Sequence, residues 1–146
     1  MNQLYKITIP INRKILLISS LVFITGLSTG FFLESFMKSS DKTHLISIIT
    51  NNTSLLSGKL TYLLLTNAIL LALILLLALS VYGAPLSSLV LFAKGLASGL
   101  SAPLVWACVD PLEYFTHFLL PTLILSFIYI VSVTICISYA LPKMHT

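Results

Sequence analysis

Four long apolar runs constrain this chain more than any other feature of its sequence. They cover residues 15–33, 60–81, 85–109 and 114–139. Each is close to the roughly 20 residues that a helix needs to cross a bilayer core of about 30 Å. Strands of a membrane barrel would alternate apolar and polar residues, whereas these runs are apolar on every side. We therefore expect an all-α fold, an integral membrane bundle of about four transmembrane helices that forms one domain over residues 1–146.

The charged residues agree with a lipid environment. Only 8% of the residues are charged, against about 25% in a typical soluble domain, so the chain cannot cover its apolar surface in water. The Lys and Arg side chains lie mostly at the ends of the apolar runs. A nucleic-acid binder would instead gather them with aromatic residues on one polar face. We therefore expect the lipid bilayer, and not nucleic acid, as a partner.

The segments between the runs predict how the helices are connected. Residues 34–59 form the only sizeable polar stretch, which we expect to be a loop; its apolar patch at 45–49 fits either an ordinary loop or a short amphipathic helix in the interface. The break at Gly83-Ala-Pro85 is so short that the spans on either side must be antiparallel neighbours. Pro103 is expected to kink the third span or to end it early. Basic residues before the first span favour a cytoplasmic N-terminus, and an even number of spans then places both termini in the cytoplasm.

Lys94 is the most unusual single residue, because it is the tenth residue of its predicted span. A lysine near the middle of a bilayer costs a few kcal/mol and usually faces other helices or a wet cavity. Three interpretations stay open: the side chain reaches a headgroup, it pairs within the bundle, or it serves in transport or proton relay. Counted from Gly83 at about 1.5 Å per residue, Asn67 lies about 24 Å and Lys94 about 17 Å along their helices. The two side chains should meet across the hairpin, unless Asn67 bonds the backbone of its own helix.

Two pairs of glycines have the spacing that lets membrane helices approach closely. Gly95 and Gly99 follow Lys94 directly, and Gly26 and Gly30 lie in the first predicted span. Small residues four apart let backbones come together, and van der Waals packing then holds the helices. The sequence leaves open whether these helix pairs form within one chain or between two.

Nothing in the sequence indicates catalysis or a cofactor. It holds no nucleophile elbow, phosphate-binding loop or metalloprotease motif, so we predict that the protein is not an enzyme. Glu113 and His117 share a helix face beside Asp110, but a metal site needs three or four ligands, and a polar cluster at the membrane interface fits better. Cys108 and Cys136 both lie in apolar stretches and are interpreted as small buried side chains.

The stretch from Asn67 to Gly99 resembles the stage II sporulation protein M family of bacterial multispanning membrane proteins. The matching residues are Asn67 in one span, Gly83-Ala-Pro85 at the turn, and Lys94-Gly95 with Gly99 in the next span. The glycine-bearing first span, Gly26 to Gly30, is also similar. The chain is short for the family and lacks the last span of the sporulation protein.

The resemblance implies a bacterial plasma-membrane scaffold that anchors partner proteins of the cell-wall machinery at the septum during engulfment. In such a scaffold the matching polar and glycine residues would hold the shape of the bundle. Other family members accompany bacteriocin production, so the alternative is a membrane subunit of an exporter or of a bacteriocin production or immunity system, with Lys94 lining a polar path. A helper subunit that is stable only inside a larger complex is a third hypothesis. In each case we expect other membrane or cell-envelope proteins as partners, in a homo- or hetero-oligomer.

Overall fold

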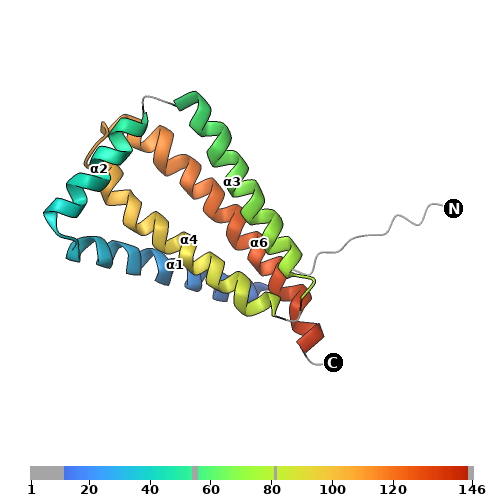
Figure 1. Ribbon diagram of the computed structural model, residues 1–146. Coiled ribbons are helices and arrows are strands. Elements are labelled where there is room, and N and C mark those ends of the chain that lie inside the picture. The colour runs from blue at the N-terminus through green and yellow to red at the C-terminus, as the bar shows by residue number, and fades with distance from the viewer. Residues whose placement is uncertain (1–11, 54–55, 81, 145–146) are drawn as a thin grey trace.

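The protein is built from helices. The computed structural model describes residues 12–53, 56–80 and 82–144, with side chains outside 49–64 and 141–144. Every regular element in these ranges is helical, which confirms the all-α prediction (Figure 1). The elements are α1 (Arg13–Phe36), α2 (Ser39–Thr53), α3 (Leu56–Leu77), α4 (Gly83–Trp106), α5 (Pro111–Glu113), the π-helix η1 (Tyr114–Leu119) and α6 (Leu120–Met144).

Three helical segments of the described chain are long and apolar enough to cross a membrane. They are Arg13–Phe36, Gly83–Trp106 and Pro111–Ala140, the last formed by α5, η1 and α6 in succession. A further apolar helical stretch, Leu65–Leu77 within α3, is shorter than a membrane span. Three helices of the predicted membrane bundle are thus long and apolar enough to span a bilayer, and the predicted number of four is not confirmed.

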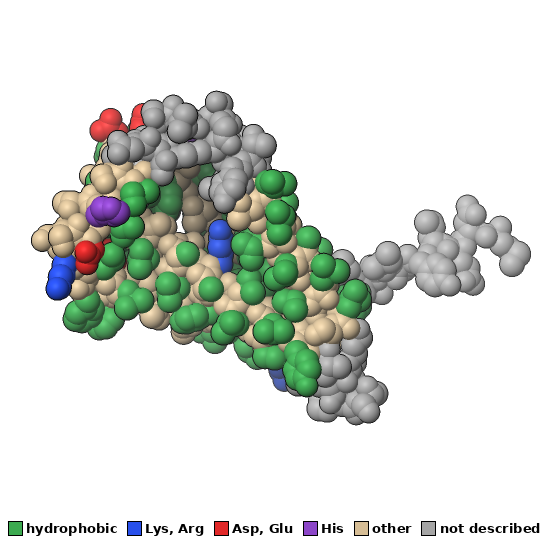
Figure 2. Space-filling view, viewed as in Figure 1, with side chains coloured by type: hydrophobic (Ala, Val, Ile, Leu, Met, Phe, Trp, Pro, Cys, Tyr) green, Lys and Arg blue, Asp and Glu red, His purple; other side chains and the backbone are tan. Residues whose placement is uncertain are grey.

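Large apolar side chains cover the outside of the bundle. Leu76, Leu89 and Phe127, on three different helices, are each at least 66% exposed. Figure 2 shows such side chains spread along the visible face. In water this surface would be strongly unfavourable, whereas hydrocarbon chains solvate it without cost.

The core lies where α1, α3, α4 and α6 meet. It includes Phe23 of α1, Ile74 of α3, Leu91 of α4 and Val133 of α6. α1 packs most extensively on α4, and these two helices run in the same direction, since Gly26 lies against Phe92 and Gly30 against Leu96. The start of α1 and the end of α6 lie at one end of the bundle, and α2 lies across the opposite end (Figure 1).

The stretch 34–59 is mostly helical, so of the two alternatives for its apolar patch the helix is the one observed, and it is longer than expected. Within it, α2 extends over 15 residues and begins with Asp41 in its first turn, where a negative charge favours the helix N-terminus. Lys42 of α2 forms an ion pair of 2.7 Å with Glu34 near the end of α1. The pair holds α2 back against the bundle, so this polar segment is a folded cap.

Two prolines shape the ends of the long helices. Pro103 lies inside α4, which ends three residues later at Trp106, so the expected early end of this span occurs after Pro103 and not at it. Pro121 is the second residue of α6, two residues after the end of η1, and it has no N–H for the carbonyl four residues earlier, that of His117. In η1 the backbone hydrogen bonds reach five residues back instead of the four of an α-helix: the Leu120 N–H donates to the Phe115 carbonyl.

Candidate functional site

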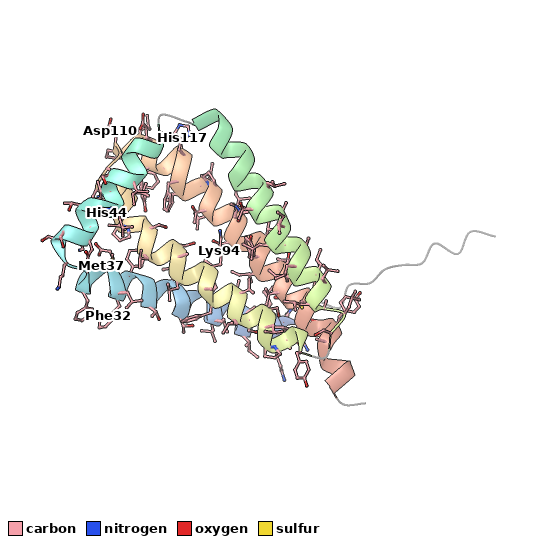
Figure 3. The ribbon with its side chains drawn as sticks, in the orientation of Figure 1. Phe32, Met37, His44, Lys94, Asp110 and His117 are labelled. Atoms are coloured by element: carbon pink, nitrogen blue, oxygen red, sulfur yellow. The ribbon has the colours of Figure 1, made fainter. Side chains whose placement is uncertain are left out.

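Lys94 lies in α4 and its side chain points toward the space between α3, α4 and α6 (Figure 3). Its ammonium donates a hydrogen bond of 3.1 Å to the Asn67 Oδ1 in α3. The rise along the two helices predicted this contact across the hairpin. Because Asn67 is 7% exposed and Lys94 half-buried, the bond forms inside the bundle and not at a headgroup.

Tyr129 of α6 completes this cluster, which we call the polar clamp (Asn67, Lys94 and Tyr129). The Tyr129 hydroxyl donates to the Asn67 Oδ1 at 3.0 Å and lies 3.3 Å from the Asn67 carbonyl oxygen. The Lys94 Nζ lies 5.3 Å from the centre of the Tyr129 ring, within cation–π range. The polar clamp therefore ties three helices together at one point, and Tyr129 itself is fully buried.

Asn67 and Lys94 of the polar clamp line a pocket of about 370 Å³ between α3, α4 and the η1–α6 rod. Its polar lining consists of Asn67, Lys94, Ser98, Ser101, His117 and Thr122. Figure 2 shows a hollow in the middle of the apolar face with a basic side chain in it, at the place where Figure 3 labels Lys94. Lys94 is thus held by other helices and is also accessible from a cavity, two features that the sequence analysis treated as alternatives.

Two helical segments supply most of the polar lining of the pocket. Lys94, Ser98 and Ser101 are four and three residues apart, so they lie on one side of α4. On the facing rod, His117 belongs to η1 and Thr122 to the first turn of α6. The π-helical register set by Pro121 determines how His117 is presented, and single turns of π-helix are frequent at functional sites.

The glycine pairs of α1 and α4 face each other within one chain. A Cβ on Gly95 would lie 2.5 Å from the Phe23 carbonyl oxygen, and one on Gly99 would lie 2.9 Å from the Leu27 carbonyl carbon. Reciprocally, Cβ atoms on Gly26 and Gly30 would meet the backbone of Phe92 and Leu96. The structure thus answers the question the sequence left open, because the two pairs form one interlocked seam between α1 and α4.

The hairpin between α3 and α4 depends on Gly83 and its neighbours. A Cβ on Gly83 would collide with the Leu77 carbonyl oxygen, so only glycine fits where the turn folds back on α3. Pro85 lies in the first turn of α4, where its missing N–H costs no helical bond. The buried Cys136 donates from its thiol to the Gly83 carbonyl at 3.7 Å, which attaches α6 to this turn.

The acidic turn before η1 lies apart from the polar clamp. Asp110 and Glu113 are exposed, and only His117 of this group lines the pocket. Within the described residues, no three His, Cys, Asp or Glu side chains are grouped closely enough to hold a metal ion. An aromatic cluster adjoins this turn, with Trp106 packed edge-on against Tyr114 at 4.9 Å.

Sequence reasoning missed Tyr129 and the hydroxyls of the pocket. A tyrosine ten residues into α6 is unusual, since tyrosine prefers the ends of membrane spans, and this placement could have drawn attention to it. The recurrence of serine at Ser98 and Ser101, on the same side of the helix as Lys94, was a second available indication. Glu113 and His117 were considered together for a metal, whereas the structure separates their surroundings.

Comparisons with protein-family models, with curated proteins and with solved structures found no match for this chain.

Proposed function

We propose that this protein is a four-span scaffold of a bacterial plasma membrane, similar to the stage II sporulation protein M family. In this role it anchors partner proteins of the septal cell-wall machinery, and both of its termini lie in the cytoplasm. Two observations support the proposal: the residues that resemble the family, and the hydrogen bonds that polar side chains form between the helices. The observation that carries it is the polar clamp, in which Lys94 and Asn67 hold helices together.

The direction of the helices supports four spans. Since α1 and α4 run in the same direction, a chain that crosses the membrane in both must cross back between them. The 15-residue α2 is too short and too polar for this, so the return falls to α3, whose 22 residues measure about 33 Å. Exposed aromatic residues at both ends of α4, Tyr82 and Trp106, agree with two interfaces about 36 Å apart.

The way the polar groups are used favours a scaffold over a catalyst. Each interhelical bond of the polar clamp contributes about 1 kcal/mol in a membrane, and the glycine seam adds close backbone packing. Such a bundle keeps a fixed shape, and α2 presents the largest polar segment outside the membrane helices. Partners would meet this cap or the exposed apolar faces of the helices, in a homo- or hetero-oligomer.

The pocket favours a second candidate function, the membrane subunit of an exporter or of a bacteriocin production or immunity system. In that function Lys94 lines a path for a polar solute, and the half-burial of its side chain beside about 370 Å³ of open space is the supporting observation. A purely structural lysine would not need this space.

A pull-down of the tagged protein from native cells in mild detergent, read by mass spectrometry, separates the two functions. Recovery of cell-wall hydrolases or their activators supports the scaffold. Recovery of a cytoplasmic ATPase with another membrane subunit sinks the scaffold and supports the exporter. The substitution Lys94→Met removes one bond of the polar clamp and keeps the bond between Tyr129 and Asn67, so a scaffold that stays folded should recover the same set of partners. A transport subunit should instead lose export while it still inserts into the membrane. Ala93→Met, on the exposed side of the same helix, is the matched control.

The number of spans has its own test. In a chain whose native cysteines are replaced, single cysteines at Ser40 in α2 and at Ser80 in the α3–α4 turn are labelled with a membrane-impermeant maleimide. Four spans place these two positions on opposite faces of the membrane, so only one of them reacts in intact cells. Reaction of both from the same side would mean that α3 does not cross.

A further inference from the structure

The pocket above the polar clamp has the chemistry of an anion site. We propose that it binds a phosphate group, carried by a phospholipid headgroup or free in solution. The inference concerns the ligand of this pocket and does not depend on the scaffold function.

Charge is the first argument. The chain has four acidic residues, and none of them lines the pocket. Among the described residues the ion pair is that of Lys42 with Glu34, while Asp110 and Glu113 are exposed in the turn before η1 and do not line the pocket. Among the described side chains, the positive charge of Lys94 therefore has only the neutral oxygen of Asn67 and the face of Tyr129 to balance it. A cation in low dielectric without a carboxylate partner attracts an anion strongly.

Unused hydrogen-bond donors are the second argument. Asn67 accepts from one of the three ammonium donors of Lys94, which leaves two for a ligand. The hydroxyls of Ser98 and Thr122 and the ring of His117 line the pocket and make no hydrogen bond to the described part of the chain. Ser98 is buried, Thr122 half-buried and His117 exposed. Phosphate oxygens are strong acceptors for donors of this kind.

Size and position are the third argument. A volume of about 370 Å³ is in the range of small-molecule sites and exceeds what one carboxylate side chain from a partner helix would fill. Ser101 lies five residues before Trp106, about 7.5 Å along α4. The pocket thus extends from Lys94 toward the aromatic end of the bundle, where the phosphates of lipid headgroups lie. A phosphate group is both small enough and close enough to enter.

Native mass spectrometry of the purified full-length chain tests the proposal in two arms. In one arm the protein in detergent is titrated with phosphatidylglycerol, and in the other with inorganic phosphate. We expect saturable binding of one equivalent in at least one arm, which identifies the source of the phosphate. Lys94→Gln keeps an N–H donor for Asn67 but removes the charge, and it should weaken binding at least tenfold. Lys14→Gln removes the same charge at the exposed start of α1 and should change binding less than twofold.

Equal weakening by both variants, or no binding in either arm, would overturn the proposal. A second measurement needs no variant at Lys94. Reductive methylation of the wild-type protein, mapped by peptide mass spectrometry, should modify Lys94 slowly when the phosphate ligand is present and faster without it, while Lys14 does not respond. In a contrary result, Lys94 is protected only when another protein co-purifies and not when either phosphate source is added. That result would indicate a carboxylate from a partner helix and would refute the phosphate site.

Discussion

A single methyl group at Gly95 should weaken the seam between α1 and α4. The Cβ of Gly95→Ala would lie 2.5 Å from the Phe23 carbonyl oxygen, where ordinary contact begins near 3.4 Å, so the helices must separate by about 0.9 Å. The obstructing atoms include the Leu27 backbone nitrogen at 3.1 Å, and backbone cannot rotate away as a side chain can. A gap of this size forfeits about a quarter to a half of the attraction for each atom pair along the seam.

The sign of the effect depends on two opposing contributions. Replacing glycine by alanine in a helix interior favours the helix by about 0.5–1 kcal/mol. Forcing extra volume into a packed contact costs about 1–3 kcal/mol. The second contribution is larger here because Gly26, Gly30, Gly95 and Gly99 share one seam, and opening it at one position loosens the others. We expect a net loss of about 0.5–2 kcal/mol.

The assay is unfolding by sodium dodecyl sulfate in mixed micelles, followed by far-ultraviolet circular dichroism. Gly95→Ala and Gly26→Ala, on opposite sides of the seam, should both lower the midpoint. Ala93→Val adds volume on the exposed side of α4 and should leave the midpoint within about 0.5 kcal/mol of the wild type. If Gly95→Ala unfolds at or above the wild-type midpoint, the two helices do not pack through their glycines and the reasoning fails.

Three further outcomes follow from the polar clamp and the thiols. Tyr129→Phe removes one hydroxyl donor to Asn67 but keeps the ring beside Lys94, so the same assay should show a loss of about 0.5–1.5 kcal/mol; an unchanged midpoint would contradict the bond. Asn67→Leu removes the acceptor that Lys94 and Tyr129 share, so it should lower the stability more than Tyr129→Phe does. In the double variant the two stability losses should not add, and strict additivity would mean that the residues act separately. Maleimide in detergent should modify Cys108 before the buried Cys136, and the reverse order would be inconsistent with the packing of α6 on the α3–α4 turn.

The chemical class of the protein was readable from the sequence because it depends on local properties. Apolar runs of spanning length need no tertiary information to indicate membrane helices. The contact between Lys94 and Asn67 was also predictable, since the short turn at Gly83 fixes how far along each helix a residue lies. A short helix around residues 45–49 was one of two predicted alternatives, but the full extent of α2 was not predicted, because its polar sequence has little apolar periodicity and its ion pair with α1 forms only in the folded chain.

The choice of facing surfaces was decided by the tertiary structure. The position of a residue along a helix follows from its number. The side of the helix that faces its neighbours does not, because a span that is apolar all round has no periodic pattern of apolar and polar residues. The sequence therefore identified both glycine pairs without indicating that they face each other, and it identified Lys94 and its partner Asn67 without the second partner, Tyr129. The pocket depends on three helices and on a π-helical turn before Pro121, so no single segment encodes it. The sequence alone shows which polar residues lie within the apolar helices. Only the packing of the helices decides which of them line the same cavity.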